Sequence, residues 1–226
     1  MNALLRQLTL RDNICCRARN AILSLLLVFA AGCAPTLDPP DKSIAQGSVV
    51  SRLDDGRRGF QIEERADMDG EIRSDFTSAV DLIEQARHDE AIVLLERVIA
   101  RLSGLTAPHV NIALAYEQKA ETEKAEKHLK TALELIPGHP VASNVYGLLL
   151  RKNGRFTQAR DIFEASLQHF PEYLPVRKNL GILCELYLGD MVGALQQFEI
   201  YNEAAPEDEQ VMIWIASLRQ RITNAE

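Results

Sequence analysis

Residues 122–137 read TEKAEKHLKTALELIP, and residues 155–171 read RFTQARDIFEASLQHFP. Each stretch has an alanine followed four residues later by a large apolar residue, Ala125 by Leu129 and Ala159 by Phe163. A spacing of four places both residues on one face of a helix. Because the two alanines lie 34 residues apart, and a fixed period of about 20 to 50 residues indicates a repeat architecture, further copies are expected.

The same pair occurs in two more stretches. RHDEAIVLLERVIARL (87–102) contains Ala91 and Leu95, and DMVGALQQFEIYNEAAP (190–206) contains Ala194 and Phe198. The four alanines are 34, 34 and 35 residues apart. Upstream of each lies another small residue, at steps of 34: Ala79, Ala113, Gly147 and Gly181. The one extra residue therefore lies inside the last copy, near LYLGDM (186–191).

This pattern resembles the tetratricopeptide repeat, a helix–turn–helix unit of 34 residues with small residues where the two helices cross. The resemblance rests on these small, aromatic and closing proline positions: Ala79, Ala91, Ala113, Tyr116, Ala125, Pro137, Gly147, Ala159, Phe163, Pro171, Gly181, Ala194, Phe198 and Pro206. It implies an all-α superhelix of about four helix pairs, with units at about 72–105, 106–139, 140–173 and 174–208. A generic helical bundle is the alternative, but four copies in register favour the repeat.

One more amphipathic helix is predicted after Pro206, in EDEQVMIWIASLRQRI (207–222). Its acids come first and its arginines last, as the helix dipole favours. We expect this capping helix to cover the last apolar face of a repeat domain spanning 74–226.

The first 32 residues have the three-part layout of a secretory signal peptide: arginines, an apolar stretch at Ala21–Ala31, then small residues. Eleven residues form a helix of about 16 Å, shorter than a hydrocarbon core of ~30 Å. The alternative is an uncleaved membrane helix, because the uncharged run extends over residues 20–37. Gly32 and Pro35 argue against one continuous helix there.

The segment AAGC at 30–33 resembles the lipobox of bacterial lipoproteins. The resemblance implies cleavage after Gly32 and a lipid anchor, including palmitate, on Cys33. Because Ala34 rather than aspartate follows, it also implies transport to the outer membrane of a Gram-negative bacterium, facing the periplasm. Two or three acyl chains hold a protein in a membrane far more firmly than one. Cys184 would then be the one cysteine left free, so no internal disulfide is expected.

Residues 33–73 show weak apolar periodicity and include several glycines and prolines, with DDGRRG at 54–59. This composition predicts a lipid-anchored flexible linker. Residues 67–72 (DMDGEI) look like part of an EF-hand calcium loop. Arg65 and Phe76 would occupy ligand positions of that loop and offer no suitable oxygen ligand, so a turn with solvated acids is favoured.

The net charge of the chain is −7, and without the first 32 residues it is −10, from 21 basic and 31 acidic residues. An acidic body repels nucleic acid and anionic lipid surfaces. The five histidines are scattered without metal-ligand spacing, and no Gly-rich phosphate loop occurs. Cys184 is expected to be a buried structural thiol. We expect no catalytic residue, cofactor, metal or small-molecule substrate.

In the tetratricopeptide family, the residue after each first-helix small residue faces the inner surface of the superhelix. Here these residues are aliphatic and 34 apart, and a turn earlier come two more apolar residues. With two basic residues at the rim, they form the predicted partner groove: Phe76, Val80, Val110, Leu114, Leu148, Arg151, Lys178 and Ile182. Such an apolar stripe is typical of a peptide-binding surface. The alternatives are that these side chains belong to the core, or that the linker covers them.

Tetratricopeptide lipoproteins that resemble this chain include pilotins, which help secretin rings assemble, and others that accompany energised transport or motility complexes. We therefore expect a non-enzymatic scaffold that binds a protein or peptide partner in the cell envelope. Its role would be to assist a pilus, secretion or energised transport machine. An adaptor that recruits peptidoglycan hydrolases or synthases is the alternative, and a self-associating homodimer is a third possibility.

Overall fold

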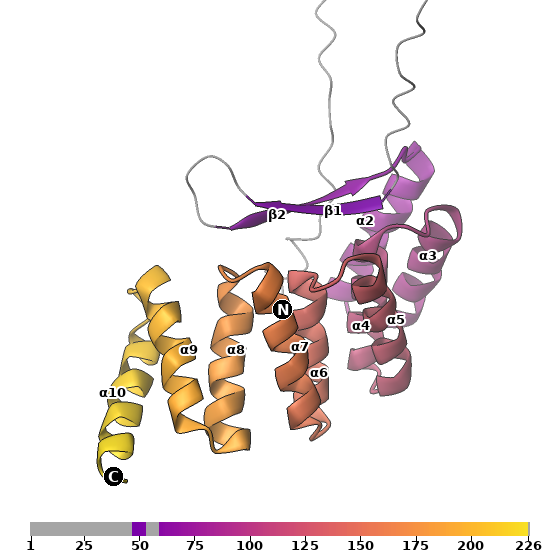
Figure 1. Ribbon diagram of the computed structural model, residues 1–226. Coiled ribbons are helices and arrows are strands. Elements are labelled where there is room, and N and C mark those ends of the chain that lie inside the picture. The colour runs from indigo at the N-terminus through magenta and orange to yellow at the C-terminus, as the bar shows by residue number, and fades with distance from the viewer. Residues whose placement is uncertain (1–46, 53–58, 226) are drawn as a thin grey trace, which may run out of the picture.

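The computed structural model describes residues 47–52 and 59–225. The predicted signal peptide, its cleavage position after Gly32 and the predicted lipid attachment at Cys33 lie outside these residues. Within the described part, consecutive antiparallel helices form an extended array with the C-terminus at one end (Figure 1).

Four helix pairs make up most of the array. They are α2 (Gly70–Glu84) with α3 (His88–Arg101), α4 (Thr106–Gln118) with α5 (Thr122–Leu135), α6 (Pro140–Lys152) with α7 (Phe156–His169), and α8 (Leu174–Leu183) with α9 (Met191–Ala204). A π-helical turn, η1 (Cys184–Leu188), prolongs α8, and α10 (Glu209–Thr223) packs on α9. The predicted all-α array of helix pairs is confirmed, with the addition of one β-hairpin.

Each pair is held by a small residue on its first helix and a large side chain on its second helix. A Cβ added at Gly147 would lie 2.2 Å from Phe163 Cε1, and one added at Gly181 would lie 2.5 Å from Phe198 Cε1. A glycine is therefore required where a phenylalanine fills the contact. In the first two units the pairs are Ala79 with Leu95 and Ala113 with Leu129, so a larger first-helix residue accompanies a smaller partner. All eight residues except the two glycines count among the buried apolar core.

Two strands precede the helices. β1 (Gly47–Arg52) pairs with β2 (Phe60–Arg65) antiparallel, with Gly47 opposite Arg65 and Arg52 opposite Phe60. The prediction of a flexible linker over 33–73 is therefore wrong for these twelve residues, since β1 and β2 contain six each. It is also wrong for the start of α2. The hairpin lies along the edge of the array where one unit connects to the next (Figure 1).

Hydrogen bonds to α4 fix one end of the hairpin. The backbone N–H of Thr106 donates to Ser48 Oγ at 2.7 Å, and that of Ala107 donates to Glu64 Oε1 at 2.8 Å. The hydroxyl of Ser48 donates to the other oxygen of Glu64. These bonds satisfy two N–H groups of the first turn of α4, which have no partner within the helix. Burial raises the pKa of Glu64, although its hydrogen bonds act in the opposite direction.

His139 extends this network into the third unit. The N–H of Ala142 donates to His139 Nδ1 at 3.2 Å, so the ring hydrogen is on Nε2. Nε2 can then donate to Thr106 Oγ1 at 3.1 Å, and Thr106 Oγ1 donates to Glu64 Oε1 at 3.0 Å. His139 is fully buried, and burial lowers its pKa to about 4. The network therefore requires a neutral imidazole.

The other end of the hairpin packs between the third and fourth units. The Phe60 ring lies 5.0 Å from the Tyr173 ring and 5.8 Å from the Phe170 ring. Arg52 forms an ion pair with Glu172 at 3.1 Å. The hairpin thus spans from the second unit to the junction before α8. The hairpin packs against side chains that are distant in sequence. Its own sequence therefore shows little apolar periodicity.

The calcium-loop resemblance at 67–72 is explained by a helix cap. Asp69 is the N-cap of α2 and accepts a hydrogen bond from the N–H of Ile72 at 2.9 Å. Arg101 donates to Asp69 and, at 3.3 Å, to Glu71. The acids therefore cap and flank a helix start, as acidic residues commonly do.

The size relation within the units predicts strong coupling between positions 147 and 163. Gly147→Ala alone should lower the free energy of unfolding by about 1–3 kcal/mol, because its Cβ overlaps the Phe163 ring. Phe163→Leu alone should also destabilise, by leaving a cavity. The double variant recreates the alanine–leucine pair of the second unit, so its loss should be smaller than the sum by about 1 kcal/mol or more. Urea unfolding of the four proteins measures this. Additive losses would contradict the proposed contact.

The buried histidine predicts acid sensitivity. Because the pKa of His139 falls from its ordinary 6.5 to about 4 on folding, the unfolded chain binds a proton between these values and the native state does not. Stability is then lost as the pH falls from 6.5 toward 4. His139→Asn keeps an acceptor for the N–H of Ala142 but cannot titrate.

Between pH 7 and pH 4.5, His139→Asn should lose about 2 kcal/mol less stability than the unsubstituted protein. Urea midpoints across this range give the comparison. The control is His169→Asn, at an exposed position, and its pH profile should run parallel to that of the parent. A parallel profile for His139→Asn as well would show that this imidazole does not control the acid response.

Candidate partner-binding surface

The apolar residues of the predicted groove divide into a half-buried and a buried set. Val80, Leu148 and Ile182 are half-buried and lie at the same register position in three first helices. Leu114, at that position in α4, is only 7% exposed, and Phe76 and Val110 are 2% and 0% exposed. The expectation that solvent reaches this whole stripe is therefore wrong for these three residues. They belong to the hydrophobic core of the array.

Lys178 is engaged in the structure rather than free at a rim. Its Nζ lies 2.7 Å from Asp208 Oδ2 and 5.4 Å from the centres of the Tyr201 and Trp214 rings. The ammonium group lowers the pKa of Asp208. Asp208 in turn caps α10 by accepting a hydrogen bond from the N–H of Val211. Lys178 therefore joins α8 to the start of α10.

Other charges on the first helices pair between units. Glu117 of α4 bonds Lys152 of α6 at 3.2 Å, and Glu185 of η1 bonds Arg221 of α10 at 2.6 Å. Such solvent-exposed pairs contribute little to stability, about 0–1 kcal/mol each. A partner that binds these four charged side chains must first break an ion pair.

The extra residue of the fourth unit lies in the π-helical turn. In each unit a residue just after the first helix, or after its π-helical extension, adopts a left-handed backbone: Ala86, Ala120, Gly154 and Gly189, at φ values of 61°, 58°, 74° and 69°. Their steps are 34, 34 and 35. Since the small residues Gly147 and Gly181 are still 34 apart, the insertion falls between Gly181 and Gly189. π-helical turns arise mostly as single-turn bulges and are frequent at functional sites.

The turn presents Tyr187 at the surface. Tyr187 is 45% exposed, and its ring lies 4.8 Å from that of Phe156. The guanidinium of Arg151 lies 5.9 Å from the centre of the Tyr187 ring. We call Arg151, Phe156 and Tyr187 the Tyr187 cluster. Leu186, in the middle of the same turn, and Val192, in the first turn of α9, are also exposed.

Arg151 has an unused donor in this cluster. Its Nη1 is buried and has no hydrogen-bond partner among the described residues. A buried donor without a partner is costly, and a carboxylate can accept two parallel bonds from a guanidinium. Tyrosine and arginine are also the residue types that most often dominate binding energy at interfaces. The cluster therefore combines an unpaired arginine donor with an exposed aromatic ring, which makes it a candidate site for an acidic group.

Of these residues, the sequence identified Arg151, Leu148 and Ile182 but missed Tyr187 and Phe156. The available signal was the single inserted residue near 186–191. An insertion inside a strict repeat changes the direction of the side chains beside it, so it marks a place to look for a binding surface.

Cys184, His109 and His128 are titratable groups whose surroundings fit a role in packing. Burial raises the pKa of the Cys184 thiol to about 11, so the thiol stays protonated at neutral pH. His109 and His128 lie with their Nδ1 atoms 3.1 Å apart inside the second unit, and burial lowers the pKa of His109 to about 4. No third metal-binding side chain joins them or any other such pair in the described part of the chain.

None of the helices in the described residues is long and apolar enough to span a bilayer.

The family model of the tetratricopeptide repeat matches residues 110–173 and, overlapping with them, residues 146–209. Each match spans two of the observed helix pairs or nearly so. A comparison with curated proteins finds no match.

Solved structures share the architecture. MamA of strain MSR-1 superposes with a TM-score of 0.53 at 19% identity, over 69% of this chain and 88% of MamA. PilF of Pseudomonas aeruginosa gives 0.60 at 19%, over 68% of this chain and 69% of PilF. A thermophilic tetratricopeptide protein of Thermus thermophilus gives 0.55 at 20%, over 67% and 82%. These likenesses concern the fold, a scaffold that typically serves protein–protein interaction. Together with the repeat contacts and the shared fold, the family match identifies residues 110–209 of this chain as tetratricopeptide repeats.

Proposed function

We propose that this protein is a lipid-anchored scaffold that binds a protein partner of a cell-envelope machine through the first-helix face near the Tyr187 cluster. The observation that carries the proposal is the combination of half-buried Leu148 and Ile182 with the unpaired Arg151 donor beside an exposed tyrosine. No group of the described residues offers a catalytic alternative of comparable strength.

The chemistry of the surface defines the partner segment. Leu148 and Ile182 would receive apolar side chains, and Arg151 would receive a carboxylate from an acidic residue or a chain terminus. Because Lys152 and Glu185 near the cluster are already in ion pairs, a strongly charged partner would gain little from them. The expected ligand is an amphipathic helix or tail with one acidic group.

The lipobox resemblance at Cys33 supports a location on the periplasmic side of the outer membrane. From Cys33 to the start of β1 at Gly47 there are 14 residues, and these can span at most about 50 Å when fully extended. The docked hairpin would thus shorten the tether expected from the sequence. A short tether favours a partner in or near the membrane, and so an envelope machine over an adaptor of peptidoglycan enzymes.

Lipid attachment is tested first. In cells labelled with palmitate, the protein should carry label, and Cys33→Ser should lose it. Cys184→Ser is the matched control and should keep the label, because Cys184 is buried within the fold. A labelled Cys33→Ser protein, or an unlabelled parent, would rule out this anchor.

Partner binding is tested by a photo-crosslinking amino acid placed at position 187 of the full chain with Cys33 intact. A defined cross-linked product should appear, and Leu148→Glu with Ile182→Glu should abolish it without loss of helical circular dichroism. The same amino acid at Val93, which is 57% exposed on α3, should not give this product. Equal cross-linking at both positions would contradict a specific surface. The identity of the product separates an envelope machine from a wall enzyme.

A further inference from the structure

Helix α10 occupies the place of the first helix of a fifth unit. The first helices α4, α6, α8 and α10 begin at residues 106, 140, 174 and 209, with the step of 35 caused by η1. Their eighth residues are Ala113, Gly147, Gly181 and Ala216. The predicted cap is therefore a repeat helix, and Ala216 stands at the small-residue position.

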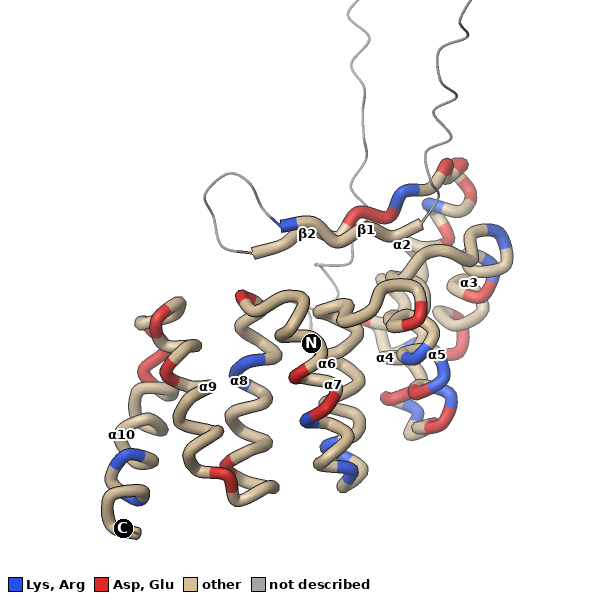
Figure 2. Tube along the Cα trace, viewed as in Figure 1, with Lys and Arg blue, Asp and Glu red and all other residues tan. Residues whose placement is uncertain are grey.

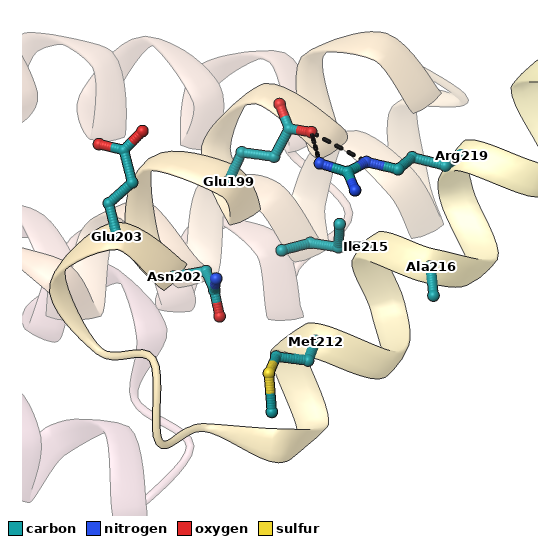
Figure 3. Close-up of a pocket in the computed structure, with 7 residues that line it drawn as sticks. All are labelled: Glu199, Asn202, Glu203, Met212, Ile215, Ala216 and Arg219. Atoms are coloured by element: carbon teal, nitrogen blue, oxygen red, sulfur yellow. Dashed lines mark hydrogen bonds and ion pairs between the residues drawn. The ribbon is translucent and has the colours of Figure 1, made fainter.

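The second helix that would pack on Ala216 is missing from the described residues. In the third and fourth units, Phe163 and Phe198 fill this contact. Beside Ala216 there is instead an open pocket of about 480 Å³ between α9 and α10 (Figure 3). It is lined by Glu199, Asn202, Glu203, Met212, Ile215, Ala216 and Arg219.

An exposed seam runs along this side of α10. Glu209, Met212, Ala216 and Arg219 are spaced by three, four and three residues, and all four are exposed. This spacing is that of the contact positions in a two-stranded coiled coil. A large residue, Met212, alternates with a small one, Ala216, so two such helices placed antiparallel can interlock.

The charges along the seam are also complementary to themselves. Acidic positions gather where α9 joins α10, and basic positions lie farther along α10 (Figure 2). The side chains of Glu203 and Glu209 pair with no described residue. Arg219 binds Glu199 at 2.7 Å, yet its side chain remains 64% exposed. In an antiparallel pair, the basic end of each helix meets the acidic end of the other.

We propose that a second copy of this chain docks here, α10 against α10, about a two-fold axis between Met212 and Ala216. Met212 of each copy packs on Ala216 of the other, and Arg219 of each copy lies beside Glu203 and Glu209 of the other. A two-fold contact uses the same surface on both subunits, which this seam satisfies. The contact involves none of the residues of the Tyr187 cluster, and the proposal does not depend on the proposed function.

A charge exchange on the full-length chain, purified in a mild detergent, tests the dimer by light scattering and sedimentation. Arg219→Glu makes both ends of the seam acidic, and Glu203→Arg with Glu209→Arg makes both ends basic. Each variant alone should show a dimer dissociation constant raised by at least about tenfold, because like charges meet. An equimolar mixture should restore a dimer containing one copy of each, and Val93→Glu should behave as the parent.

Circular dichroism of each variant verifies that the helices persist, and the mixture distinguishes a lost interface from a damaged fold. A parent chain that stays monomeric at high micromolar concentration would overturn the proposal and leave the pocket to a helix of another protein. Variants that dimerise like the parent, or a mixture that fails to recover the dimer, would overturn it as well.

Discussion

The contact between a small residue on the first helix and a large side chain on the second is the constraint on which the rest of the structure depends. It brings the two helices so close that a larger side chain on one helix requires a smaller side chain on the other. In the first two units the pair is alanine with leucine, as at Ala113 and Leu129. In the last two units it is glycine with phenylalanine, as at Gly147 and Phe163. Because no unit buries its apolar face alone, this contact and the stacking of units stabilise the array together.

Both surfaces proposed for binding lie where the chain departs from the regular repeat. One inserted residue converts the end of α8 into the turn Cys184–Leu188 and brings Tyr187 beside Arg151. At the end of the array, α10 has the small residue of a first helix but no second helix in the described chain. Elsewhere most apolar side chains of the helix pairs are buried, and several charges form ion pairs. The regular units form the scaffold, and both proposed binding surfaces lie at the exceptions.

The helix pairs were predictable because each unit carries its own signals at a fixed period, from Ala79 to Phe198. The hairpin was not, because Ser48 and Glu64 find their partners at Thr106 and Ala107, more than 40 residues away. Local composition there resembles a linker, and only tertiary contacts order it. The groove was predictable in part. Register alone places Leu114 and Leu148 alike, but in the structure Leu114 is buried and Leu148 is half-buried, a difference that no local sequence signal encodes.

The close contact itself is observable by nuclear magnetic resonance. The Hα protons of Gly147 and Gly181 should give strong nuclear Overhauser effects to the ring protons of Phe163 and Phe198, and ring currents should move their chemical shifts far from ordinary helical values. Both follow from aromatic rings that occupy the space a Cβ would need. Ordinary helical shifts for these glycines, without cross-peaks to the two rings, would contradict the packing on which the fold and both proposed surfaces rest.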